Sequence, residues 1–192
     1  MSRPRRSELL PVWLGLAALL VLALSGCGKA AAPAPSASVK QTWDPTAADS
    51  ACQVVTEHDA SSALGQDPGP GVPSSHQNPQ DGLVYRHQCL YGDSQKGVWV
   101  EVNTHPNAVS SFTNSARINI EAHEAEPLDG IGEAGFIAFA STPDLSPPNW
   151  HWYVAFLKGP ATFTVAVTLN GRDQAAVRQL TVDLARAAAG RV

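Results

Sequence analysis

The chain has 192 residues, of which 44% are hydrophobic, and this is enough to bury the core of one domain. Its 13 basic and 17 acidic residues give a formal net charge of −4. A mildly acidic surface repels phosphate backbones, so the composition argues against a nucleic-acid partner.

The first 27 residues combine a charged start with an apolar run. Arg3, Arg5 and Arg6 come before residues 9–24, which carry no charge. This is the order of a secretory signal. A transmembrane helix is the alternative, but the run is shorter than the roughly 20 residues that such a helix needs. The run ends at Leu24-Ser25-Gly26-Cys27.

These four residues resemble the lipobox of bacterial lipoproteins. The resemblance implies a diacylglyceryl group on the Cys27 sulfur and cleavage just before Cys27. We therefore predict that residues 1–26 are a cleaved signal peptide and that the protein is anchored by lipid to the outer face of the cell membrane. Cleavage would remove three of the 13 basic and one of the 17 acidic residues, leaving 10 against 16, a net charge of −6. Attachment then depends on the acyl chains and not on a basic patch.

The segment after the lipidated cysteine is rich in alanine, proline and serine. Residues 28–40 have hardly any large apolar side chain, so this stretch cannot bury enough surface to fold. We predict that residues 27–48 form a tether and that residues 49–192 form a single extracytoplasmic domain.

The domain is predicted to begin with helical structure. Residues 51–55 are a short apolar segment of about one turn. Thr56 is a suitable N-cap, with Asp59 three residues later to complete a capping box. The helix then covers residues 57–64 and ends at Gly65, which suits the left-handed position after a helix.

Two cysteines remain once lipidation has used Cys27. Cys52 and Cys89 form an even pair in an oxidising compartment, which favours a disulfide. A pair of buried free thiols is the alternative. A bridge would join the first helical segment to a strand.

Residues 66–81 contain four prolines among glycines and polar residues, and we predict a long loop there. Residues 83–90 and 98–104 are predicted to form a hairpin. In the second of these strands Val98, Val100 and Val102 alternate with Trp99, Glu101 and Asn103, which is the period of a half-buried strand.

The rest of the chain adds helices and strands in turn. Residues 107–126 are predicted to be a helix, because apolar residues recur every four positions at Ala108, Phe112, Ala116 and Ile120. Residues 135–141, 150–158 and 161–170 are predicted strands, and residues 173–189 a final helix. The result is an α+β fold in which a mainly antiparallel sheet of about five strands packs against two to three helices.

The lipobox, the cysteine beside a threonine-capped helix, Cys89 on the first strand and the turn at residues 130–134 together resemble a group of actinobacterial lipoproteins of unknown function. The last hairpin and the alanine-rich terminal helix continue the match. The resemblance implies a location and a fold but no reaction. A more distant likeness is to the extracellular sensor domains of mycobacterial receptor kinases, although this chain has only one cysteine pair.

Motifs for catalysis or cofactors are weak. Residues 130–135 spell G-x-G-x-x-G, but they follow a proline and lead into a strand, so we expect a turn and not a dinucleotide site. Six histidines stand singly, without the spacing of a metal site. Hydrolase motifs and a free nucleophilic thiol are also missing. We predict no cofactor and no metal.

The strongest candidate for a binding site is Trp150 and Trp152. They lie where a proline-rich approach becomes a strand, and aromatic side chains dominate binding surfaces. The alternative is that they belong to the core.

The sequence therefore predicts a non-catalytic cell-envelope lipoprotein that binds a small ligand or an envelope protein. An extracytoplasmic hydrolase with a site assembled across the fold is one alternative. A structural accessory subunit of a membrane complex is the other.

Overall fold

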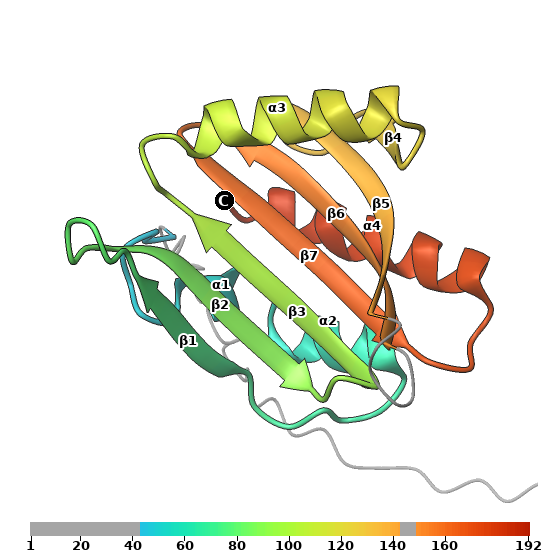
Figure 1. The fold of residues 1–192 in the computed structure, drawn as a ribbon. Coiled ribbons are helices and arrows are strands. Elements are labelled where there is room, and N and C mark those ends of the chain that lie inside the picture. The colour runs from blue at the N-terminus through green and yellow to red at the C-terminus, as the bar shows by residue number, and fades with distance from the viewer. Residues whose placement is uncertain (1–42, 143–148) are drawn as a thin grey trace, which may run out of the picture. The chain divides into compact units, whose positions relative to one another are not determined.

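The computed structural model describes residues 43–142 and 149–192, and within them seven strands form one antiparallel sheet with four helices (Figure 1). The helices are α1 (Ser50–Val54), α2 (Glu57–Leu64), α3 (Ala108–Glu121) and α4 (Gln174–Ala189). The strands are β1 (Val72–Gln77), β2 (Val84–Gly92), β3 (Lys96–Asn103), β4 (Ala125–Leu128), β5 (Ala134–Thr142), β6 (Asn149–Lys158) and β7 (Ala161–Leu169). Their order across the sheet is β1-β2-β3-β7-β6-β5-β4.

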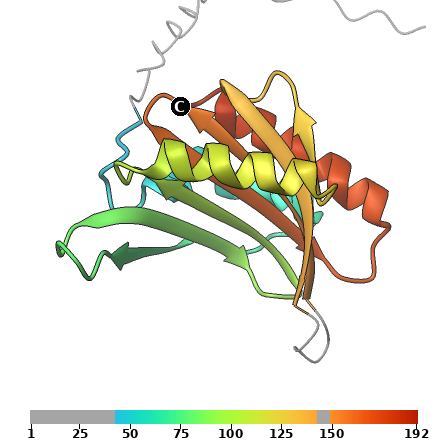
Figure 2. The same ribbon diagram turned by 45° about the horizontal axis from the view of Figure 1, so that its top comes forward.

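The helices divide between the two faces of the sheet (Figures 1 and 2). α1, α2 and α4 pack on the face that carries Val100 and Val165, which we call the covered face. α3 alone packs on the opposite face, which carries Trp99 and Ala166 and which we call the open face. α3 packs mainly on strands β4 to β7, so most of the β1–β3 part of the open face has no helix packed over it within the described residues.

The main core lies between the covered face and its three helices. Alternation in β3 points Val98, Val100 and Val102 into this core, and all three are fully buried. Phe156 and Phe163 stack beside them with ring centroids 4.9 Å apart. A second, smaller core lies under α3, where Phe112 packs near Phe136, Ala138 and Ala155. The predicted alternation of β3 is confirmed.

The start of the domain is fixed as its sequence predicts. Thr56 and Asp59 form the capping box of α2, and Gly65 ends the helix at φ 66°. Cys52 and Cys89 form a disulfide that joins α1 to β2. Trp43 packs on Phe163 at a ring distance of 5.3 Å, so the core also uses a residue from the segment predicted as tether.

The predicted counts of about five strands and two to three helices are too low. One of the missing strands, β1, lies inside the predicted loop of residues 66–81. All six of its side chains are exposed, and its residues are mostly polar. Backbone pairing with β2 makes this edge strand, so its sequence carries no hydrophobic alternation to reveal it.

The other strand absent from the prediction, β4, begins in the last two residues of the predicted helix of residues 107–126. α3 stops at Glu121, and His123 then takes a left-handed backbone at φ 60°. β4 follows and pairs with β5. Pro127 is compatible with β4 because this strand lies at the edge of the sheet.

The G-x-G-x-x-G pattern forms the turn between β4 and β5, as predicted. Gly130 and Gly132 have φ of 73° and 63°. A Cβ on Gly132 would lie 2.3 Å from the carbonyl oxygen of Leu157, so this glycine is required by a close approach as well as by its φ. No helix starts there to hold a pyrophosphate.

Lys40–Val192 form one compact unit. Both cores and the disulfide lie within it, so we expect this unit to fold when produced alone. Within residues 43–142 and 149–192, no helix is long and apolar enough to cross a membrane. The predicted signal peptide, Cys27 and most of the tether lie outside the described residues.

Candidate functional site

Away from α3, the open face carries rows of side chains that come from different strands. Sheet register places Leu90 of β2 opposite Trp99 of β3, and Trp99 opposite Ala166 of β7. His151 of β6 pairs with Thr168 of β7 in the neighbouring row. The strand order β2-β3-β7-β6 therefore brings these five residues together from distant parts of the chain.

These residues line a cavity of about 380 Å³. Leu90, Trp99 and Ala166 supply its apolar surface, and Gly97 lies in its wall. Leu90 is 38% exposed, which is high for a leucine, while Trp99 is half-buried. The cavity thus offers an aromatic ring and an aliphatic side chain to solvent on a rigid sheet.

Three polar groups of this cavity have no hydrogen-bond partner in the described part of the chain: the Trp99 indole N–H, the His151 imidazole and the Thr168 hydroxyl. Burial lowers the pKa of His151, so its ring is neutral at pH 7 and offers one donor and one acceptor. All three groups are accessible to water, because the Ser50 hydroxyl is the one buried side-chain polar atom without a partner among the described residues. Their free hydrogen-bonding capacity suits a ligand that brings its own polar atoms.

A polar band continues along the open face from this cavity. Gln88 donates to Glu101 Oε2 at 2.8 Å and accepts from His76 Nε2 at 2.9 Å. Gln88 is opposite Glu101 in the register of β2 and β3. The open face therefore changes from apolar at Trp99 to polar at Glu101, one row away.

A second cavity, of about 440 Å³, lies beyond the polar band, between the β1–β2 turn and the start of α3. Asn78, Arg86 and His105 line it together with Tyr85 and Asn103. Tyr85 and His105 meet edge to face with centroids 4.7 Å apart, and this contact holds the imidazole in place.

The sequence-predicted binding residues lie elsewhere. Trp152 is half-buried on the covered face, where its indole donates to Gln174 Oε1 at 3.1 Å and Arg178 lies over its ring at 5.8 Å. Phe139 packs on the same ring and lines a separate cavity with it. The side chain of Trp150 lies outside the described residues, although its backbone pairs with Ser141 in the sheet.

Trp99 and His151 were not predicted as site residues. The alternation of β3 shows that a tryptophan occupies the polar side of that strand, and this was the available signal for Trp99. His151 had no comparable signal, because its position beside Thr168 depends on the pairing of β6 with β7.

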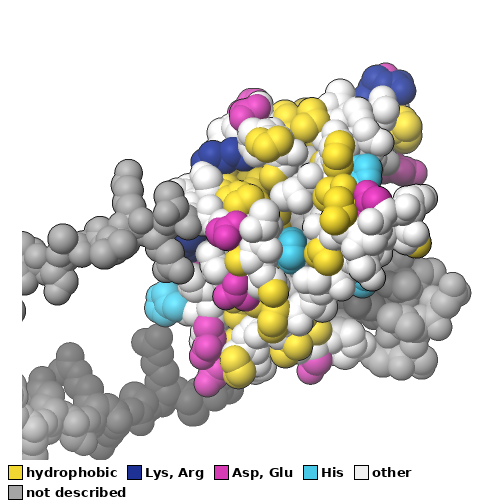
Figure 3. Space-filling view, turned by 90° about the vertical axis from the view of Figure 1, so that its left-hand side faces the viewer, with side chains coloured by type: hydrophobic (Ala, Val, Ile, Leu, Met, Phe, Trp, Pro, Cys, Tyr) yellow, Lys and Arg dark blue, Asp and Glu magenta, His cyan; other side chains and the backbone are white. Residues whose placement is uncertain are grey.

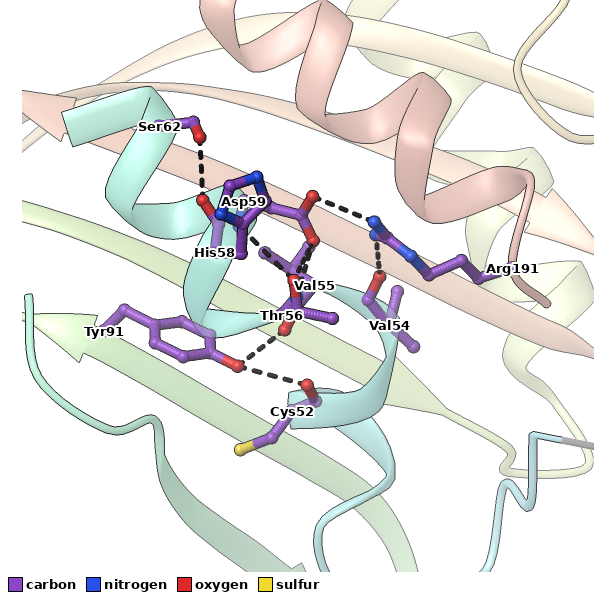
Figure 4. A network of polar contacts seen from close by, with 9 residues as sticks. All are labelled: Cys52, Val54, Val55, Thr56, His58, Asp59, Ser62, Tyr91 and Arg191. Atoms are coloured by element: carbon purple, nitrogen blue, oxygen red, sulfur yellow. Dashed lines mark hydrogen bonds and ion pairs between the residues drawn. The ribbon is translucent and has the colours of Figure 1, made fainter. Parts of the chain in front are cut away.

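A network of polar contacts on the far side of the sheet is structural (Figure 4). The Tyr91 hydroxyl donates to the carbonyl oxygens of Val55, at 2.6 Å, and Cys52, at 3.1 Å. Burial, with the nearby carboxylates of Asp59 and Glu57, raises the pKa of Tyr91 to about 12, so the phenol stays protonated as a donor. These bonds anchor the α1–α2 junction to β2.

Arg191 closes the same network. It donates to Asp59 Oδ1 at 2.9 Å and to the carbonyl oxygen of Val54 at 3.0 Å (Figure 4). Burial acts to raise the pKa of Asp59, but hydrogen bonds from Thr56 and Arg191 outweigh it and the pKa is lowered. Arg191, which follows α4, thereby connects this helix to the start of α2.

Within the described residues, no group of three or more histidine, cysteine or acidic side chains is placed to hold a metal ion. No protein-family model, curated protein or solved structure matches this chain.

Proposed function

We propose that this protein is a lipid-anchored cell-envelope lipoprotein whose domain binds a ligand without catalysing a reaction. The Cys27 lipid would hold it on the outer face of the cell membrane. The ligand would lie along the open face, with an apolar part on Trp99 and Leu90.

The observation that carries this proposal is the cavity around Trp99. Aromatic side chains contribute most of the binding energy in many interfaces, because they combine a large apolar area with little flexibility. Here a half-buried tryptophan lies beside an exposed leucine, with three polar groups that lack partners among the described residues. Strands β2, β3, β7 and β6 hold these groups in a preformed arrangement, which lowers the entropic cost of binding.

Asp93, Ser94 and His151 also line this cavity, and these residue types suggest a hydrolase. The structure gives no hydrogen bond between Ser94 and His151 among the described residues, whereas a nucleophile and its base need such contact. The Asp93 carboxylate instead accepts from the backbone N–H groups of Lys96 and Gln95, which lower its pKa. This arrangement supports binding over hydrolysis.

The proposal is tested with N-phenyl-1-naphthylamine, a neutral apolar fluorescent probe, and the Lys40–Val192 unit. We expect saturable binding that Trp99→Ala weakens about tenfold or more, because the variant removes the aromatic surface. Ile118→Ser is the matched control, since Ile118 is 54% exposed on α3 and outside the cavity. Equal affinity in wild type and Trp99→Ala, with both folded, would refute the proposed site.

A second variant separates this site from the one predicted from the sequence. Trp152→Phe keeps an aromatic ring on the covered face but loses the bond to Gln174. Weaker probe binding in Trp152→Phe with no effect of Trp99→Ala would move the site to the Trp152 cavity.

A further inference from the structure

The cavity beside the start of α3 has an excess of hydrogen-bond donors. It is formed where the β1–β2 turn comes close to the segment that leads from β3 into α3. Three side chains decide its chemistry: Asn78 from the turn, Arg86 from β2 and His105 from the segment before α3.

The position of the proton on His105 follows from a backbone contact. The Asn107 N–H donates to His105 Nδ1 at 3.0 Å. Because Nδ1 accepts this bond, the neutral ring carries its proton on Nε2. His105 Nε2 therefore acts as a donor toward the cavity.

The orientation of the Asn78 amide is fixed in the same way. Its Oδ1 accepts from the Gln80 N–H at 3.0 Å, so the other terminal atom is the amide nitrogen. This nitrogen lies 3.4 Å from His105 Nε2 and 3.5 Å from an oxygen of Asp81. One amide hydrogen is thus directed toward Asp81, and the second faces another donor.

Arg86 adds five more donors to this cavity. Its side chain is exposed, and it has no hydrogen bond or ion pair in the described part of the chain. Asp81 is the nearby carboxylate in the turn, but it already accepts from the Tyr85 hydroxyl at 3.0 Å and from the Leu83 N–H at 2.9 Å. Arg86, His105 Nε2 and the second amide hydrogen of Asn78 thus have no protein acceptor among the described residues.

We propose that this cavity binds an oxyanion, whose oxygens accept from Arg86, His105 and Asn78. Carboxylates and phosphates share this acceptor chemistry, and both match the planar fork of arginine. An oxygen between His105 Nε2 and Asn78 Nδ2 would turn a donor–donor contact into two hydrogen bonds. Directed donors, and not bulk charge, give the site its selectivity: Figure 3 shows basic side chains only as separate patches on this side of the molecule.

The position of the cavity connects it to the open face. Arg86 and Leu90 lie on the same side of β2, four residues apart, which is roughly 13 Å along a strand. If the proposed function is correct, the ligand is elongated, with an apolar part at Trp99 and an anionic end at Arg86. The elongated shape of the ligand depends on the proposed function, whereas the oxyanion site does not.

The test follows the ring resonances of His105 by NMR in the Lys40–Val192 unit, during separate titrations with sodium phosphate and sodium acetate at constant ionic strength. We expect saturable chemical-shift changes. The anion with the lower dissociation constant, phosphate or acetate, identifies the ligand chemistry. Arg86→Gln should weaken binding about tenfold or more, the amount expected for a hydrogen bond to a charged group. Arg172→Gln is the matched control, because Arg172 is exposed and does not line the cavity.

Asn78→Asp gives a second, independent variant. It puts a carboxylate oxygen where the amide nitrogen faces His105, so the protein itself supplies the acceptor and anion binding should be lost. The inference is overturned if neither anion gives saturable shifts, if Arg86→Gln and Arg172→Gln weaken binding equally, or if Asn78→Asp binds as wild type.

Trp99→Ala keeps this test separate from that of the proposed function. The variant should leave anion binding unchanged, since Trp99 does not line this cavity. Anion binding without probe binding by the wild type would support the oxyanion site and refute the apolar site at Trp99. Probe binding without anion binding would support the apolar site and refute the oxyanion site.

Discussion

Reduction of the Cys52–Cys89 bridge should destabilise the domain strongly. The two cysteines are 37 residues apart, and the loop that they close contains α2, β1 and most of β2. Loop-closure entropy for this length gives about 4 kcal/mol of stabilisation. In a domain of this size about 1 kcal/mol changes the melting temperature by roughly 2–4 °C, so we expect a decrease of roughly 8–16 °C.

The assay is thermal unfolding of the Lys40–Val192 unit, followed by circular dichroism with and without a phosphine reductant. Reductant should lower the melting temperature of the wild type and leave the Cys52→Ala/Cys89→Ala double variant unchanged. That variant controls for any effect of the reductant itself. Melting curves of the oxidised and reduced wild type that coincide would refute the entropic reasoning.

Three further predictions concern the polar network and the anchor. Tyr91→Phe should lower the free energy of unfolding, measured in urea, by about 1–3 kcal/mol, because it leaves the Val55 carbonyl buried without its donor. An unchanged urea midpoint of unfolding would contradict this prediction. Asp59→Asn should lower the free energy of unfolding of the domain at pH 7, and it should remove the part of the pH dependence of stability that comes from this carboxyl group. Since the folded pKa of Asp59 lies below its ordinary value of 3.8, its stabilisation is present above that pH and is lost as the pH falls through the lowered pKa; parallel wild-type and variant profiles from pH 5 to 2 would refute it. Cys27→Ala should abolish palmitate labelling and processing of the precursor, and a variant that is still labelled would exclude the lipid anchor.

Much of the fold could be predicted because its signals are local. The capping box of α2 needs only Thr56 and Asp59, and the core face of β3 follows from alternate valines. β1 and β4 lie at the two edges of the sheet, where backbone pairing replaces the burial of alternate side chains. Such strands leave little trace in the sequence, so a loop and the end of a helix were predicted in their place.

The candidate site was harder to predict because its residues are brought together by strand order. Trp99 was visible on the polar side of β3, but its neighbours Ala166 and His151 come from β7 and β6. The oxyanion cavity depends on a contact between Asn78 and His105, which are 27 residues apart. No pattern in either segment indicates that their donors face each other.

The most direct test of the open face as a binding surface is an amide chemical-shift map. ¹⁵N-labelled Lys40–Val192 would be titrated with N-phenyl-1-naphthylamine. We predict that the largest saturable shifts occur at Leu90, Trp99 and Ala166, with small changes in α1, α2 and α4. Shifts concentrated around Trp152, or no saturable shifts at all, would contradict the account.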